Sequence, residues 1–283
     1  MSAKLSVLAS LLFLFIVCTA QAAPKEIHWY NNFNQGAKVA RETGKPLLLD
    51  FQAEWCGPCK AMEIEFWPKQ NVVEIAEKFV CVNIDIDKET GVAAQYQANP
   101  IPLMVIADPW SNQIYRHTGY RNMEGLLNVM KAMPGDFSEV VEWGDLLKKD
   151  SKNGRAMIGL AEFYHKNGIA DLSADHYKRA LKTKELESDL ELRESVFLKL
   201  GINYMRMKNY AEAQKVFERC MKELPQAKQG DQALVGMVLC QIGQGKLNDA
   251  ETTLGQLQTK YPGSKAAQRG AEQLSAAKAQ KTK

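Results

Sequence analysis

The chain has 283 residues, of which 46% are hydrophobic and 24% are charged, and these proportions are ordinary for a globular protein. Its length corresponds to about two domains. The formal net charge of +3 is too small to indicate a nucleic-acid partner, and a solvated surface of mixed charge explains it more simply.

Residues 1–22 have the features of a secretory signal peptide. Lys4 supplies the positive charge, Leu5–Val17 forms a short apolar core, and Ala20-Gln21-Ala22 fits the small-residue cleavage pattern. We therefore expect cleavage after Ala22. The apolar core is shorter than the roughly 20 residues that a membrane-spanning helix needs.

Secretion across the inner membrane would place the mature chain in an oxidising compartment, and we expect a bacterial periplasm. Cys18 raises the alternative of a lipid-anchored protein. Bulky Val17 precedes this cysteine where lipidation requires a small residue, so the soluble exported form is preferred.

After the leader, short apolar segments alternate with segments of helical spacing. Thr43-Gly44-Lys45-Pro46 ends the first helical segment, and Asn71 is expected to cap the third. Strands are predicted at 27–30, 47–51, 79–86, 103–107 and 114–117, and helices at 33–42, from 59 to about 67, and at 72–78, 90–97 and 123–133. This alternation predicts an α/β fold whose sheet is covered by helices on both faces.

The motif Trp55-Cys56-Gly57-Pro58-Cys59-Lys60 lies where the second predicted strand turns into a helix. Unpaired backbone N–H groups and the helix dipole stabilise a thiolate at such a position. Cys56 is therefore predicted to lie ahead of the helix, exposed and with a lowered pKa. Cys59, one turn into the helix, is predicted to be shielded and to act as the resolving thiol. Pro58 suits an early helical position because it has no N–H to leave unpaired.

Two segments resemble thioredoxin. Asp50–Lys60 is similar to its active-site segment, and Asn99-Pro100-Ile101-Pro102-Leu103 is similar to its cis-proline loop. The resemblance covers about residues 26–133 and implies a thioredoxin fold, a central mixed sheet flanked by helices. It also implies that Cys56 is the nucleophile, Cys59 the resolving thiol, and Asp50 the buried carboxylate that takes the proton from Cys59. The substrate contacts that it implies are Trp55, Gly57, Pro58, Ile101 and Pro102, with Pro102 in the cis form.

The chain departs from thioredoxin at two positions. Gln52 stands where thioredoxin usually has a tryptophan, and Asn83 stands about where it has the lysine that pairs with the buried carboxylate. Proton relay and partner surface could therefore differ. With apolar neighbours and no obvious cation, burial is expected to raise the pKa of Asp50. The simpler alternative is that Asp50 is an ordinary carboxylate at the end of a strand.

The cysteine pair has two other interpretations, a structural disulfide and a zinc site. Zinc needs four ligands, and neither a second CxxC motif nor a spaced histidine pair accompanies this one. We therefore expect no metal, and no cofactor besides the redox-active disulfide between Cys56 and Cys59. No role is assigned to His28, His117, His165 or His176.

The other cysteines of the expected mature chain lie in predicted core positions. Cys81 falls in a strand and is expected to be a buried free thiol. Cys220 and Cys240 fall in two successive predicted helices of the C-terminal region. They could form a disulfide in an oxidising compartment or pack as two separate core thiols, and the second arrangement is preferred.

The second half of the chain repeats itself. Eight positions match the offsets of the tetratricopeptide pattern, with phenylalanine in place of the usual tryptophan: Phe197, Leu200, Gly201, Tyr204, Ala213, Phe217, Cys220 and Pro225. A further copy covers residues 234–262, and a weaker first copy covers residues 157–180. The region resembles a three-repeat helical solenoid, followed by a capping helix at 266–278.

These features divide the chain into a signal peptide (1–22), a thioredoxin-like domain (23–134), a junction with its own helix (135–155) and an all-α repeat domain (156–283). The domain edge is marked by Met133-Pro134-Gly135-Asp136, and the helix predicted at 137–149 is expected to buttress the junction.

The preferred function is an exported thiol–disulfide oxidoreductase that acts as a reductase or isomerase on protein clients. Its expected partners are proteins with thiols or disulfides, a membrane or periplasmic thiol electron donor, and a protein held in the repeat groove. One alternative is an oxidase of thiols. Another is a scaffold or chaperone in which the redox site has a minor role.

Overall fold

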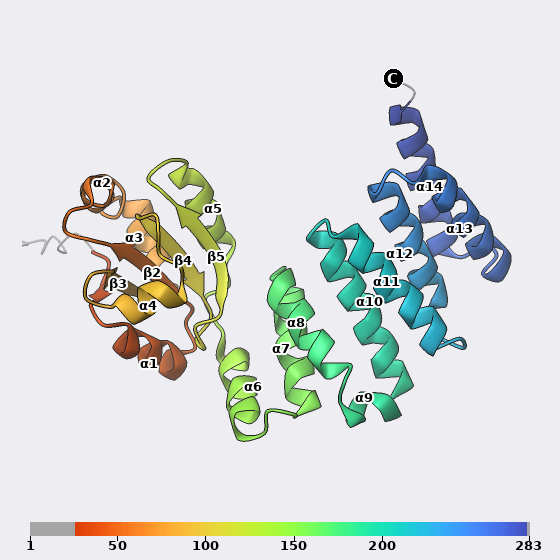
Figure 1. Cartoon of the computed structure of the whole chain (residues 1–283), viewed down its shortest axis with the longest axis horizontal. Coiled ribbons are helices and arrows are strands. Elements are labelled where there is room, and N and C mark those ends of the chain that lie inside the picture. Colours follow the sequence, from red (N-terminus) through yellow and green to blue (C-terminus); the bar gives the residue numbers. More distant parts are fainter. Residues whose placement is uncertain (1–25, 282–283) are drawn as a thin grey trace, which may run out of the picture.

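The computed structural model describes residues 26–281 and shows a sheet region (residues 26–133) followed by an all-helical repeat region (residues 154–281), as Figure 1 shows. The expected signal peptide, its cleavage site after Ala22 and Cys18 lie outside the described residues. Within residues 26–281 no helix is both long and apolar enough to cross a membrane.

The sheet has five strands in the order β1-β3-β2-β4-β5. The first three of these run parallel to one another, whereas β4 is antiparallel to both β2 and β5. The strands are β1 (Trp29–Tyr30), β2 (Leu47–Gln52), β3 (Val80–Asp85), β4 (Leu103–Ala107) and β5 (Gln113–Thr118). The predicted α/β fold with a mixed sheet is therefore confirmed. Strand β4 is fully buried, and β2 is buried except at its last residue, Gln52.

Helices cover both faces of the sheet. One face buries residues of α1 (Phe33–Thr43) together with Tyr96, which ends α4 (Thr90–Gln95). The other face buries residues of α2 (Gly57–Glu65), α3 (Gln70–Ala76) and α5 (Met123–Ala132). Successive residues of β3 point to opposite faces of the sheet: Val80 and Val82 pack on one face and Cys81 on the other.

The prediction that Asn71 caps a helix was wrong. The N-cap of α3 is Lys69, which has an extended backbone and makes no side-chain capping bond. Its carbonyl oxygen accepts the amides of Val72 (2.8 Å) and Val73 (3.0 Å), so the helix has already begun when the chain reaches Asn71. The turn after Pro68, rather than a capping side chain, decides where this helix starts.

The repeat region is joined to the sheet region through a shared core. Helix α6 (Ser138–Lys149) leads into α7 (Gly154–Lys166), and one buried cluster contains Met104 of β4, Leu126 of α5 and Phe163 of α7. The hydroxyl of Tyr164 on α7 donates to Asp108 Oδ2 just after β4 at 2.5 Å. Because β4 runs opposite to β2, this junction lies at the pole of the sheet away from the cysteine pair (Figure 1).

The predicted repeats correspond to three helix pairs. They are α7 with α8 (Ala170–Ala180), α10 (Leu190–Arg206) with α11 (Tyr210–Glu223), and α12 (Gly230–Gly243) with α13 (Leu247–Lys260). The short α9 (Lys184–Ser188) precedes the second pair, and α14 (Lys265–Lys281) follows the third as the expected last helix. The buried ring of Phe217 lies directly against Gly201 and Gly236, where any side chain larger than hydrogen would collide with it.

Candidate active site

The two cysteines of the motif form a disulfide at the start of α2. Their sulfurs are 2.01 Å apart and their Cα atoms 5.3 Å apart. Cys56 is the N-cap of the helix, and its Sγ accepts the backbone N–H of Cys59 at 3.2 Å. Pro58 lies in the first turn, as expected. The sulfur of Cys56 is therefore the capping atom of the helix, which is where an anion is most stabilised.

The expectation that Cys56 is exposed was wrong. In the disulfide form Cys56 is 3% exposed and Cys59 is 7% exposed. Both pack in a small apolar cluster with Ala53, Ile86 and Ile101. Ile86 and Ile101 lie in loops far along the chain, and the sequence alone does not predict that these loops contact the start of α2. The sulfurs are therefore covered from the side by neighbouring loops even though the motif lies at the tip of the sheet.

The exposed surface around the disulfide comes from the residues beside the cysteines. Gly57 and Pro58 are exposed, and Trp55 is 67% exposed although it is a large apolar side chain. The indole N–H of Trp55 donates to Oδ2 of Asp87, in the turn after β3, at 2.8 Å. This bond holds the Trp55 ring beside that turn. Ile64 on α2 is a second large exposed apolar side chain of the same region.

The cis-proline loop lies against the disulfide. The Ile101–Pro102 peptide is cis, as the resemblance implied, and the Asn99–Pro100 peptide is cis as well. Pro102 is buried, whereas Ile101 is half-buried and contacts the cysteine cluster. Among the described residues, no backbone hydrogen bond is made by the N–H or C=O of Ile101. That backbone is available to an extended peptide.

Asp50 is buried in the middle of β2, at 6% exposure. Its Oδ2 accepts the indole N–H of Trp67 at 2.9 Å, and its Oδ1 is buried without a partner. Burial raises the pKa of Asp50 to about 7, the Trp67 hydrogen bond opposes this, and the negative charge of Glu63 adds to it. Asn83 on β3 is the partner of Asp50 in the strand pairing, so an uncharged residue stands about where thioredoxin has its lysine.

A cavity of about 490 Å³ lies beside Asp50 and the resolving cysteine. Its walls include Asp50, Cys59, Glu63, Trp67 and Asn83. A cavity of this size with carboxylates in its wall has room for several water molecules. The sequence alone does not reveal Trp67 or Glu63 as parts of the site. Trp67 lies 17 residues from Asp50 in a segment that reads only as a helix end.

Comparisons with known proteins agree with this geometry. A family model described as thioredoxin-like matches residues 28–109, and one described as a tetratricopeptide repeat matches residues 204–274. An H-type thioredoxin of Fagopyrum esculentum is 30% identical over 110 residues, which are 38% of this chain and 89% of that protein. The chain belongs to the thioredoxin family. Its C-terminal region carries tetratricopeptide repeats.

One further relative and one solved structure are similar to part of the chain. A thioredoxin-like protein of Synechocystis sp. is 35% identical over 74 residues, which are 26% of this chain and 69% of that protein. The solution structure of a thioredoxin from Thermus thermophilus is 20% identical, covers 38% of this chain and 85% of its own, and has a TM-score of 0.35.

Within residues 26–281, the other cysteines of this thioredoxin-family protein take no part in the redox disulfide. They are free, buried thiols, and burial raises the pKa of each to about 12: Cys81, Cys220 and Cys240. Cys220 and Cys240 are thus the two separate core thiols of the preferred prediction. In the part of the chain that the structure describes, no group of three or more His, Cys, Asp or Glu side chains could hold a metal ion.

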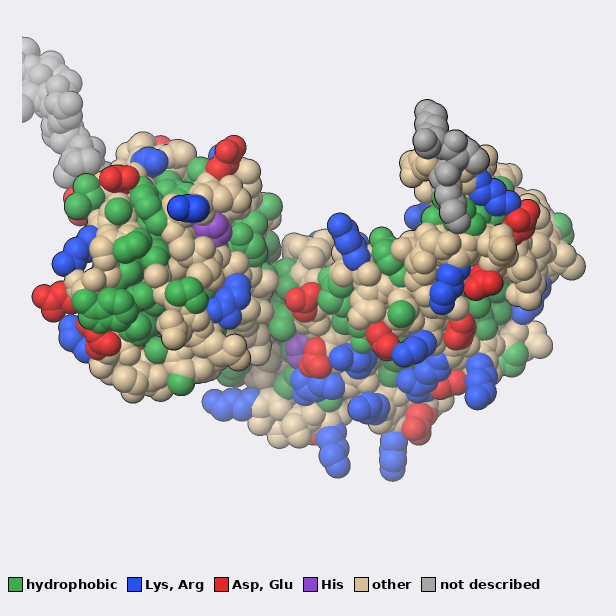
Figure 2. Space-filling view, turned by 45° about the horizontal axis from the view of Figure 1, so that its top comes forward, with side chains coloured by type: hydrophobic (Ala, Val, Ile, Leu, Met, Phe, Trp, Pro, Cys, Tyr) green, Lys and Arg blue, Asp and Glu red, His purple; other side chains and the backbone are tan. Residues whose placement is uncertain are grey.

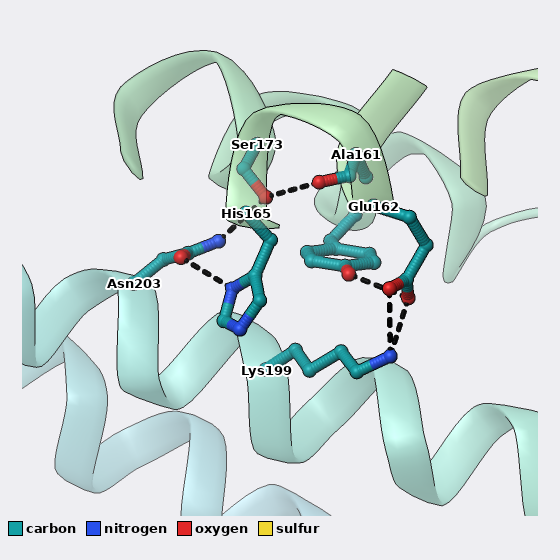
Figure 3. A network of polar contacts seen from close by, with 7 residues as sticks. Ala161, Glu162, His165, Ser173, Lys199 and Asn203 are labelled. Carbon is teal, nitrogen blue, oxygen red and sulfur yellow. Dashed lines mark hydrogen bonds and ion pairs between the residues drawn. The ribbon is translucent and has the colours of Figure 1, made fainter. Parts of the chain in front are cut away.

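The tetratricopeptide region contains a groove of about 590 Å³ over α10 and α12. Its wall includes the exposed apolar side chain of Ile202 and the charged side chains of Lys199, Arg206 and Arg269. Figure 3 shows that Lys199 reaches across to Glu162 on α7, with Nζ 2.7 Å from both carboxylate oxygens. This ion pair therefore connects the groove wall on α10 to the neighbouring helix pair.

Behind this groove, a buried polar chain ties the first two helix pairs together (Figure 3). Asn203 Oδ1 lies 2.8 Å from His165 Nδ1, and Asn203 Nδ2 donates to Ser173 Oγ at 2.7 Å. Ser173 in turn donates to the carbonyl of Ala161 at 2.7 Å. Every member has a partner, so this chain specifies how α7, α8 and α10 pack.

Charge is divided unevenly between the two regions. Residues 26–149 contain 12 Lys and Arg against 17 Asp and Glu, a net charge of −5, whereas residues 150–283 contain 22 against 16, a net charge of +6. Figure 2 shows the corresponding surface, with Lys and Arg side chains concentrated over the repeats and hydrophobic side chains gathered on the visible face of the thioredoxin-like region. The small overall charge conceals this separation.

Proposed function

We propose that this protein is an exported thiol–disulfide oxidoreductase that reduces or isomerises disulfides in protein clients. The observation that carries the proposal is the Cys56–Cys59 disulfide at a helix N-terminus, beside a cis-proline and a buried carboxylate, in a thioredoxin-family chain. Export is supported by the leader-like sequence of residues 1–22.

The reaction begins with the dithiol form. The Cys56 thiolate attacks one sulfur of a client disulfide, the client S–S bond breaks, and its second sulfur leaves as a thiolate that takes a proton from solvent. Cys56 is then joined to the client in a mixed disulfide. The helix N-terminus favours the attacking anion, because the backbone N–H of Cys59 points at the Cys56 sulfur.

Release of the client needs a second thiolate. Asp50 takes the proton of the Cys59 thiol through water in the cavity that both line, and the Cys59 thiolate attacks the Cys56 sulfur. The bond from Cys56 to the client breaks, the client sulfur leaves as a thiolate that takes a proton from solvent, and the Cys56–Cys59 disulfide remains. A pKa of about 7 lets Asp50 accept and return protons near neutral pH. Two electrons and two protons from a thiol donor restore the dithiol.

Client binding uses the surface around the disulfide and the repeats. Trp55, Pro58 and the free backbone of Ile101 offer an apolar face and a strand-like pairing site beside the sulfurs. The groove over α10 and α12 offers a second site for a protein segment. Because the junction is a shared core, a partner in the groove stays at a fixed position relative to Cys56.

The proposal is tested with the purified mature chain. The wild type should reduce insulin with dithiothreitol as donor, Cys56→Ser should be inactive, and Cys59→Ala should accumulate clients as mixed disulfides through Cys56. A wild-type rate equal to the buffer blank would refute it. A redox potential at the strongly oxidising end of the known range would assign the protein as an oxidase instead. N-terminal sequencing of the periplasmic fraction should begin at Ala23.

A further inference from the structure

The buried carboxylate of this chain is bound by an uncharged donor. The Trp67 indole N–H donates to Asp50 Oδ2 at 2.9 Å, while Asp50 Oδ1 has no partner although it is buried. Trp67 follows α2, and Asp50 lies within β2, so this bond connects the central strand to the end of the active-site helix. An indole offers one N–H in one direction and carries no charge.

Trp67 is held rigidly enough to act as a fixed donor. The residue is 6% exposed, its backbone N–H donates to Met62 O at 3.1 Å, and its ring lies edge-on to Trp29 at 5.1 Å and to Phe66 at 4.9 Å. A side chain fixed on several sides loses little further freedom when it makes a hydrogen bond, so the donor is already in place before Asp50 ionises.

The groups that face Asp50 come from every element around it. Cys59 and Glu63 approach from α2, Asn83 from β3, Met104 from β4 and Trp67 from the segment after α2. The rest of the cavity wall is Glu26, Ile27, Trp29, Gln52, Pro68, Gln70 and Val73, and Cys81 is the further titratable group near the carboxylate. Within the described chain, the cavity wall includes no Lys, Arg or His.

We propose that Trp67 is the positioning residue of the proton relay. Its indole binds one oxygen of Asp50 and leaves Oδ1 as the oxygen that exchanges the proton of Cys59. This inference rests on the proposed function, because it concerns the step in which Cys59 becomes a thiolate.

The choice of donor matters for the reaction. A lysine or arginine in this cavity would favour the ionised carboxylate more strongly than the indole does, and would lower the pKa of Asp50 further. The indole binds one carboxylate oxygen and fixes the plane of the carboxyl group. Because the indole is uncharged, it stabilises the ionised form of Asp50 less than a cation would. Asp50 therefore combines a fixed orientation with a pKa close to the pH at which it must work.

The test removes the N–H and follows Asp50 directly. In Trp67→Phe the carboxylate loses a hydrogen bond, so the Asp50 pKa, read from the carboxyl carbon signal in NMR of the oxidised protein, should rise by at least about 1 unit. At pH 7 the ionised fraction of Asp50 would then fall about fivefold. The second phase of the reaction of the dithiol with Ellman's reagent, in which Cys59 displaces the reagent from Cys56, should slow by the same factor and recover at higher pH.

Three variants separate positioning from packing. Trp143→Phe on α6 removes another indole that packs against the same buried cluster but lies outside the cavity wall, and it should leave the pH profile unchanged. Benzothienylalanine at position 67 has the shape of tryptophan without the N–H, and it should reproduce the shift with normal thermal stability. In the Asp50→Asn background, Trp67→Phe should no longer change the pH profile.

The inference is overturned if the Asp50 pKa of the benzothienylalanine protein equals that of the wild type, or if Trp143→Phe causes the same shift. The two measurements are the NMR titration of the Asp50 carboxyl carbon and the rate of reaction with Ellman's reagent, and neither needs a protein client. They remain decisive even if the protein proves unable to reduce protein clients, which would refute the proposed function alone.

Discussion

Replacing Asp50 with asparagine should make the protein more stable and a poorer catalyst. The folded protein holds Asp50 with a pKa of about 7, against 3.8 for an unperturbed aspartate, because burial disfavours the charged form. A carboxyl whose pKa is raised by folding favours the folded state only while it is protonated. Stability is therefore lost as the pH rises from about 4 through about 7.

The size of the effect follows from the shift. About 3 pKa units at about 1.4 kcal/mol each give roughly 4 kcal/mol of destabilisation above pH 7, and roughly 0.5 kcal/mol at pH 4. Asparagine is isosteric, keeps an oxygen for the Trp67 N–H, and cannot ionise. Asp50→Asn should therefore exceed the wild type by up to about 4 kcal/mol at pH 8 and match it closely at pH 4.

Guanidinium unfolding of the oxidised chain, followed by far-UV circular dichroism between pH 4 and pH 8.5, measures this difference. Asp145→Asn on α6 is the matched control, since this exposed residue should change stability by less than about 0.5 kcal/mol at any pH. If Asp50→Asn shows no gain at pH 8, or a gain that does not grow with pH, then the burial of Asp50 does not govern its titration and the proton-relay argument fails.

Three other outcomes are expected. Tyr164→Phe removes the hydroxyl donor of buried Asp108 and should cost about 1.5–3 kcal/mol, measured by calorimetry; a loss under 0.5 kcal/mol would contradict a shared core at the junction. Gly236→Ala should cost about 1–3 kcal/mol, because its Cβ would lie 2.6 Å from the Phe217 ring, whereas Gly255→Ala meets nothing within 4 Å and should stabilise α13 by up to about 1 kcal/mol. In the folded, reduced protein at pH 8, iodoacetamide should label the motif cysteines and leave the three buried thiols unmodified until denaturant is added. Mass spectrometry identifies the labelled cysteines. Labelling of any of the three buried thiols before denaturant is added would mean that the helix or strand that carries it opens.

Local signals were sufficient for much of this protein. The order of strands and helices, the redox motif at a strand-to-helix turn and the helical repeats all depend on residues close together in sequence, and these predictions agree with the structure. The cis form of Pro102, which the resemblance to thioredoxin implied, agrees as well. Burial of Asp50 was also predictable, because its neighbours in β2 are apolar on both sides.

The tertiary structure decided what depends on distant contacts. Cys56 is covered because Ile86 and Ile101 come from two other loops, and Asp50 receives its hydrogen bond from Trp67 instead of a cation. The repeat region is joined to the sheet region by a hydrogen bond from the Tyr164 hydroxyl to Asp108, a residue 56 positions away in sequence. Periodicity describes which face of a segment is buried, but not which partner covers it, since the partner is chosen by the packing of the whole chain.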